Sequence, residues 1–235
     1  MKTRFRPLAI LLALASVSTV AQAVPIPTLF GTGLSPGGLA LASGAADPHY
    51  TLVLAPPGVP FPASPLVVGP VNPPAWAPNT ATSQWINPTG TGAFVEGGDY
   101  WYETTFDLTG FVASTTSITG AWAADDAGMS ISLNGVPMAG TSTGVGVGSY
   151  AGLHLFLISG AALPWLPGIN TLLFKSSNTG PPFAPFTGPT GIQVKILSAD
   201  ADVIPVPAAA WLFGSGLLAL GGLRLRQAPR VTQGA

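Results

Sequence analysis

Short runs of β-forming residues, each closed by turn-forming residues, recur through the middle of the chain. They span 84–86, 100–106, 117–123, 129–133, 154–158, 170–175 and 191–197, with Gly, Pro, Asn or Asp at their ends. Many short strands separated by turn signals are typical of an antiparallel sandwich or barrel. No stretch outside the two ends of the chain shows a sustained helical period. The sequence therefore predicts an all-β fold, an antiparallel β-sandwich of jelly-roll-like type.

Alternation within two of these runs assigns their faces. In the run 100–106 the even-numbered residues share one face and the odd-numbered residues share the other, so that one side can be buried and one wet. In the last run the inward face is expected to hold Ile192, Val194 and Ile196. Gln193 and Lys195 fall on its wet face. The pair Asn134-Gly135 follows the run 129–133 and predicts a hairpin, because a type I′ turn needs positive φ at both positions.

The absence of cysteine means that a core must hold the fold together. With no Cys in 235 residues, disulfides, thiolate metal sites and cysteine nucleophiles are all excluded. The 55 Gly and Pro residues approach a low-complexity composition, but the chain is still 47% hydrophobic. Residues 24–82 are the most proline-rich part, and they predict a loosely structured lead-in with short edge strands. The sandwich domain is expected at 83–200.

The N-terminus has the three parts of a signal peptide. Lys2, Arg4 and Arg6 precede the apolar run 8–20, and Ala21-Gln22-Ala23 closes it. The apolar run is too short to span about 30 Å of hydrocarbon as an anchor. We therefore expect residues 1–23 to be removed by signal peptidase, with Ala21 and Ala23 at the cleavage site.

The C-terminus carries a second apolar segment followed by positive charge. As a helix, residues 208–223 would cover roughly 24 Å, which makes them a marginal membrane span. Arg224, Arg226 and Arg230 follow it, and this bias predicts a cytoplasmic C-terminus with the body outside. The alternative is a buried core helix, but Ser215 is the one polar residue in the segment, so the 3.6-residue period of such a helix is missing.

The same tail resembles the PEP-CTERM sorting signal. The resemblance rests on Val206, Pro207, Ala208 and Trp211, followed by the apolar helix and by Arg224 and Arg226, within a region 203–230. Val206 stands where the Pro-x-Pro motif usually has glutamate. The resemblance implies a Gram-negative protein that is exported across the inner membrane, held there as an anchored intermediate, and processed by the membrane transpeptidase exosortase. It further implies delivery to the cell surface or the exopolysaccharide and biofilm matrix.

Once both ends are removed, the body is acidic. Between Val24 and Val203, Lys175 and Lys195 stand against nine carboxylates, which gives a net charge of −7. Polyanions are bound by clustered Lys and Arg. The sequence therefore argues against nucleic acid as a partner.

The central runs resemble galactose-binding-like jelly rolls over residues 83–198. The resemblance rests on the motifs Gln84-Trp85-Ile86, Leu133-Asn134-Gly135 and the run 118–126. It implies a β-sandwich of a kind that often binds carbohydrate, and it carries over no sugar-binding residue. Polysaccharide is accordingly an expected partner.

Catalytic groups are sparse in the sequence. Residues 140–144 fit G-x-S-x-G, but they lie in a Gly/Thr/Ser loop and not between a strand and a helix. Neither His49 nor His154 has a recognisable triad or metal partner. Glu96, Asp99 and Glu103 form one acidic group.

Asp125 and Asp126 form a second acidic group, which leaves three interpretations open. They can be turn or strand-capping residues, ligands of a structural Ca²⁺, or a catalytic pair. No cofactor is otherwise expected.

Exposed aromatic rings are the remaining route to a ligand. Trp165 lies in a loop between Pro164 and Pro167 and is the candidate for stacking on a sugar ring. The sequence thus favours a non-enzymatic, surface-sorted β-sandwich of the matrix or envelope. The alternatives are a carbohydrate-binding module and a glycoside-active enzyme.

Overall fold

The structure is a computed structural model that describes residues 22–69, 75–180, 184–185, 187–205 and 213. Residues Gln22–Ile204 form one compact unit. Residues 1–21 of the expected signal peptide, including Ala21, lie outside the described residues, as do Val206, Pro207, Ala208, Trp211, Arg224 and Arg226. The described part of the chain includes no helix with the length and apolar character that a bilayer crossing needs.

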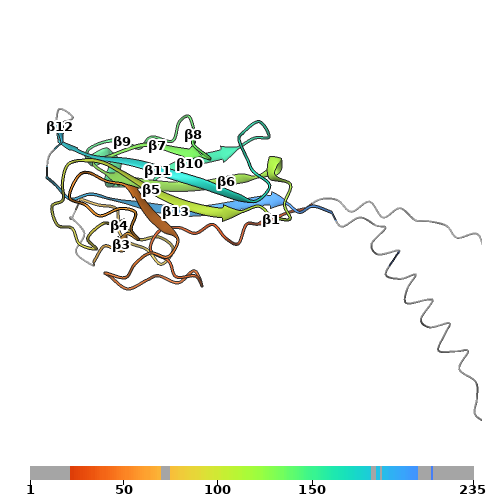
Figure 1. Ribbon diagram of the computed structural model, residues 1–235, viewed down its shortest axis with the longest axis horizontal. Helices are drawn as coiled ribbons and strands as arrows, with labels where there is room; N and C mark the ends of the chain where they lie inside the picture. Colours follow the sequence, from red (N-terminus) through yellow and green to blue (C-terminus); the bar gives the residue numbers. More distant parts are fainter. Residues whose placement is uncertain (1–21, 70–74, 181–183, 186, 206–212, 214–235) are drawn as a thin grey trace, which may run out of the picture. The chain divides into compact units, whose positions relative to one another are not determined.

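Two mostly antiparallel β-sheets pack into a sandwich (Figure 1). The first sheet has the order β10-β6-β13-β4-β3, with β1 added beside β13; its strands are β1 (Ala23–Pro25), β3 (Leu66–Val67), β4 (Ile86–Asn87), β6 (Ser117–Asp125), β10 (His154–Ser159) and β13 (Gly191–Asp202). The second has the order β2-β5-β11-β7-β8, with β12 on β11 and β9 on β7; its strands are β2 (Tyr50–Leu54), β5 (Gly98–Asp107), β7 (Ala127–Leu133), β8 (Val136–Pro137), β9 (Gly144–Val145), β11 (Ile169–Gly180) and β12 (Ala184–Pro185). The helical segments of the described chain are short, η1 (Ala113–Thr115) and α1 (Val147–Tyr150). The predicted β-sandwich is therefore confirmed.

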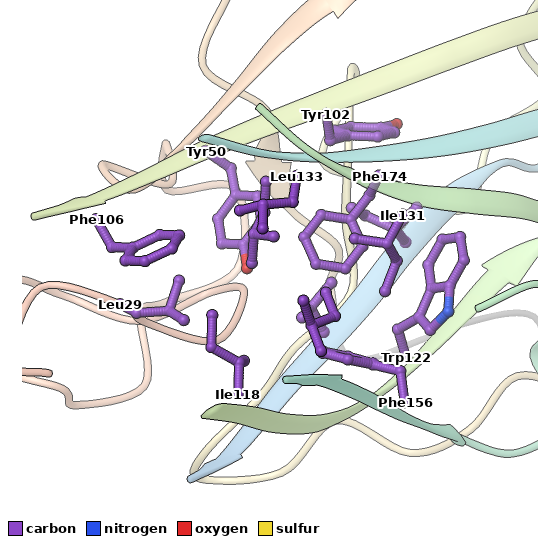
Figure 2. Close-up of a cluster of buried hydrophobic side chains, with 14 of the residues drawn as sticks. Leu29, Tyr50, Tyr102, Phe106, Ile118, Trp122, Ile131, Leu133, Phe156 and Phe174 are labelled. Atoms are coloured by element: carbon purple, nitrogen blue, oxygen red, sulfur yellow. The ribbon is translucent and has the colours of Figure 1, made fainter. Parts of the chain in front are cut away.

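Aromatic and branched side chains from both sheets fill the space between them (Figure 2). Tyr100, Tyr102 and Phe106 on β5 are buried, while Thr105 on the opposite face is exposed. Trp122 on β6 packs edge-on against Phe174 on β11, with ring centroids 5.5 Å apart. The predicted alternation of β5 is confirmed, because the period of two places every second side chain in this core.

The predicted hairpin at Asn134-Gly135 is also confirmed. It joins β7 to β8, and the two residues have φ angles of 48° and 83°. The Asn134 side chain reaches beyond its own turn, because its Oδ1 accepts a hydrogen bond from the Thr171 N–H at 2.8 Å. Its Nδ2 donates to the Pro164 carbonyl at 2.7 Å. The Asn134 side chain thus links the loop at Pro164 to β11.

The proline-rich lead-in is part of the sandwich and does not precede it. β2 forms one edge of the second sheet, and β3 forms an edge of the first. The Asp47 carboxylate is buried and accepts hydrogen bonds from the backbone N–H groups of Gly33 and His49, at 2.6 and 2.8 Å. The short edge strands expected for residues 24–82 are therefore confirmed, whereas the segment is not loose, because buried groups such as Asp47 bind its backbone N–H groups.

A second, smaller apolar layer covers the outer face of the first sheet. Trp76 and Trp85 lie with ring centroids 4.2 Å apart, and Ala123 of β6 is buried beneath this layer. Gln193 of β13 lies under the same layer and is completely buried, with its Nε2 donating to the Pro78 and Ser83 carbonyls. The prediction that Gln193 faces water is wrong, since both faces of this end of the sheet are covered.

Candidate functional site

Asp125 and Asp126 lie where the chain passes from β6 in the first sheet to β7 in the second. The backbone at this corner is tied to its neighbours on three sides. The Thr190 hydroxyl donates to the Asp125 carbonyl at 2.6 Å, and the Asp126 N–H donates to the Ser177 carbonyl at 3.0 Å. The Gly146 N–H donates to the Asp126 carbonyl at 2.8 Å. These bonds fix the positions of both carboxyl groups.

The two carboxyl groups are withdrawn from solvent. Asp125 is only 4% exposed, and its Oδ2 accepts a hydrogen bond from the Trp76 indole Nε1 at 2.7 Å. Asp125 Oδ1 and Asp126 Oδ2 are both buried, and neither has a donor among the described residues. Asp126 thus lies between two consecutive strands, as a turn or strand-capping interpretation expects, while the Asp125 carboxyl bonds the Trp76 indole.

Burial dominates the electrostatics of this corner. It raises the pKa of Asp125 to about 8, and the neighbouring carboxyl of Asp126 adds to the effect. Burial also raises the pKa of Asp126, although the Asp125 side chain and then the Thr179 backbone oppose the rise. The neutral form of Asp125 is therefore favoured up to neutral pH.

Few metal-ligating side chains surround Asp125 and Asp126 in the described part of the chain. Among the described residues, no group of three or more His, Cys, Asp or Glu side chains is placed to hold a metal ion. The Ca²⁺ interpretation of Asp125 and Asp126 thus rests on two carboxylates, whereas Ca²⁺ takes six to eight oxygen ligands. A hollow of about 410 Å³ adjoins the corner, lined mainly by small and apolar residues that include Met129 and Val145.

The carboxyl groups of Glu96, Asp99 and Glu103 do not form a cluster. Asp99 and Glu103 lie on the outer face of β5, and four residues of extended strand separate their Cα atoms by about 13 Å. The two carboxyls of a glycosidase are about 5–9.5 Å apart. Trp101 lies between them on that face, with the Lys175 Nζ 4.4 Å from its ring centroid. Glu96 is exposed and offers its backbone carbonyl, not its side chain, to the Tyr100 hydroxyl at 2.6 Å.

Trp165 is buried, contrary to the expectation of an exposed stacking platform. It is 9% exposed, its ring meets Phe106 edge-on with centroids 6.4 Å apart, and its Nε1 donates to the Gly160 carbonyl at 3.0 Å. The flanking prolines turn the loop so that the indole closes one end of the core. The other body tryptophans also lack an exposed face, since Trp76, Trp85 and Trp122 are buried and Trp101 is half-buried beneath Lys175.

The G-x-S-x-G segment has no features of a nucleophile elbow. Ser142 lies in the loop between β8 and β9, so it is followed directly by a strand and not by the helix that the elbow requires. Its hydroxyls serve the backbone: Ser142 Oγ donates to the Gly128 carbonyl at 2.9 Å, and Thr141 Oγ1 donates to the Met138 carbonyl at 2.8 Å. These residues hold the loop against β7.

A hollow between the lead-in and the second sheet was not foreseen from the sequence. It has a volume of about 460 Å³, and its walls include Phe30, His49, Thr105 and Asp107. The His49 and Phe30 rings are stacked, with centroids 3.9 Å apart. Hydrogen bonds from Thr109 lower the pKa of the Asp107 carboxyl, so the hollow carries an ionised acceptor at its rim. Long-range contacts of the lead-in create it, and no local motif marks it.

Comparison of the chain with models of known protein families, with curated proteins and with solved structures finds no match.

Proposed function

We propose that the chain is an exported, non-enzymatic β-sandwich that a PEP-CTERM-like tail delivers to the surface of a Gram-negative cell, where it serves in the envelope or the extracellular matrix. Signal peptidase and an exosortase-type transpeptidase are its processing partners. Before processing, the segment 208–223 holds it in the membrane. The sequence signals at the two ends carry the sorting part of this proposal.

The bounds of the folded body support it. The first paired residue is Ala23, at the expected signal cleavage site, and Val24 and Pro25 pair with Ala201 and Asp200 near the end of β13 (Figure 1). At the other end, the Ile204 N–H donates to the Gly110 carbonyl at 2.9 Å, two residues before Val206 of the sorting motif. Cleavage at both expected places would thus remove Ala23 from β1 and leave the pairs of Val24 and Pro25 with β13 in place.

Intact-mass measurement of the protein from its native surface fraction tests the sorting. The expected species begins at Val24 and ends near Pro207, because both expected cleavage sites lie at the rim of the folded body. A variant truncated after Ile204 should fold and appear in the medium instead of at the surface. A mass that retains residues 1–23 would contradict export, and one that retains Arg224 to Ala235 would contradict tail cleavage.

Carbohydrate binding is the second candidate function, and the hollow beside Phe30 and His49 favours it. Threonine hydroxyls, an ionised carboxylate and apolar ring faces are groups that recognise a neutral sugar. The body's two lysines, Lys175 and Lys195, are not among the residues that line it, so an uncharged glycan suits it better than an anionic one.

Asp107→Ala should weaken retention on a neutral-polysaccharide affinity gel by about tenfold, the effect of losing one hydrogen bond to a charged group. Asp99→Ala removes an exposed carboxylate from the same strand outside the hollow and is the matched control. Equal retention of the wild type and both variants, or no retention at all, would remove this candidate.

A further inference from the structure

Two oxygen atoms of the Asp125 and Asp126 carboxyl groups are buried without a hydrogen-bond donor among the described residues. Each group has one oxygen that is buried and lacks a donor, and the two groups belong to neighbouring residues, so that the Asp126 carboxyl acts directly on Asp125. Two ionised carboxylates cannot satisfy one another, since both are acceptors only. A single proton between them makes one group a donor and gives both buried oxygens a partner.

The surroundings favour a proton over a metal ion. No third acidic or histidine side chain joins the pair in the described part of the chain. A calcium ion would need several more oxygen ligands, whereas a proton needs only the two that are present. The Thr190 hydroxyl and the Ser177 carbonyl hold the backbone of the corner through hydrogen bonds within the chain.

The pair also holds the small apolar layer on the first sheet. Trp76 donates its indole N–H to Asp125, and the neighbouring Ala77 N–H donates to the Tyr150 carbonyl at 2.7 Å. The Trp76 ring also packs at a tilt on Trp85, and the Trp85 Nε1 donates to the Ala77 carbonyl at 2.8 Å, so that several contacts attach this segment, residues 75–79. Outward movement of the segment would admit water to the carboxyls.

We propose that Asp125 and Asp126 share one proton in the folded protein, and that this proton fastens segment 75–79 against the first sheet, so that the segment opens as the pH rises. Loss of the proton leaves two negative charges side by side in a buried corner. Solvation of those charges then favours the open segment.

Few other charges face the pair. Tyr150 on α1 is a titratable group that both carboxyls affect; burial and the two carboxyls raise the pKa of its hydroxyl, so it stays neutral in the relevant range. The described stretches packed against the corner carry no charged side chain: 75–79, 144–149, 176–179 and 190–193. The response to pH is therefore assigned to the pair itself.

The sign of the pH effect on opening follows from the number of protons that the closed and open forms bind. The closed form holds a proton up to pH about 8, whereas an Asp that faces water loses it near its ordinary pKa of 3.8. Between these values opening releases one proton, so the opening equilibrium should increase about tenfold for each pH unit. Stability from the pair is complete below pH about 4 and is lost as the pH rises towards 8. Asp47, whose pKa burial also raises, gives a parallel effect on global unfolding that is common to all variants.

Hydrogen exchange of the amides of residues 76–85 between pH 5 and pH 9 tests the proposal, with variants compared at the same pH. In the wild type, protection corrected for intrinsic rates should fall about tenfold per unit and level off above pH 8. Asp125→Asn replaces the shared proton by an amide N–H and should be nearly independent of pH. Asp126→Asn should show the same independence of pH, and it is the variant to measure if Asp125→Asn folds poorly. Asp99→Asn, an exposed carboxylate, should follow the wild type.

Three results would overturn the proposal. The first is a fall in protection that persists unchanged in both Asn variants. The second is wild-type protection that does not vary with pH. The third is a melting temperature at pH 6 that rises on addition of 1 mM CaCl₂ in the wild type but not in Asp125→Asn, which would place a cation between the carboxyls.

Discussion

Trp122→Ala should lower the free energy of unfolding by about 3–5 kcal/mol, a large part of the 5–15 kcal/mol that stabilises a typical domain. The side chain is fully buried, packs edge-on against Phe174, and donates its indole N–H to the Thr141 carbonyl at 2.8 Å. Its removal opens a cavity between the sheets and leaves that carbonyl without its donor (Figure 2). Urea denaturation followed by circular dichroism measures the loss.

Trp101→Ala is the matched control for this substitution. The Trp101 ring is half-buried on the outer face of β5 under Lys175, and an interaction of this kind contributes about 0.5–1 kcal/mol. The control should therefore cost about 1 kcal/mol. Equal losses for the two variants would mean that the space between the sheets is not the principal core.

Gly120→Val should destabilise the protein by about 3 kcal/mol through overpacking. A Cβ atom at this position of β6 would stand 2.7 Å from Cε1 of Phe156 and 2.9 Å from the Lys195 carbonyl oxygen. The aromatic ring can move, but the carbonyl belongs to the neighbouring strand of the sheet and cannot. Gly168→Val, where a Cβ would meet open space, is the control and should change stability little.

A double-mutant cycle locates the cause of this effect. If Phe156 is the obstacle, Gly120→Val combined with Phe156→Ala should cost less than the sum of the single changes, by about 1 kcal/mol or more. Strict additivity would assign the strain to the backbone of β13 alone. The same denaturation measurement serves both experiments.

The fold was accessible from the sequence because strand period and turn chemistry are local. The even positions of 100–106 and the pair Asn134-Gly135 specify a face and a turn from adjacent residues. The lead-in was misjudged because its order comes from distant partners. Thr32 Oγ1, for example, donates to the Gln84 carbonyl and accepts from the Val194 N–H.

The candidate site shows the same limit. The sequence singled out Asp125 and Asp126, but nothing near them indicates that Trp76, far back in the lead-in, donates to one of them. The prediction that Trp165 is exposed was wrong for a related reason. Flanking prolines predict a loop, yet they do not say on which side of the loop the indole lies, and here Phe106 receives it.

The pairing of β1 with the end of β13 links the fold to the order of synthesis. Val24 lies beside Ala201, so the first strand of the body to leave the ribosome must wait for the last one before its hydrogen bonds can form. Contacts of such long sequence separation form late, because a large loop must close first. On the proposed export route, we therefore expect the chain to stay unclosed, and able to pass through a translocation channel, until nearly all of the body has crossed the membrane.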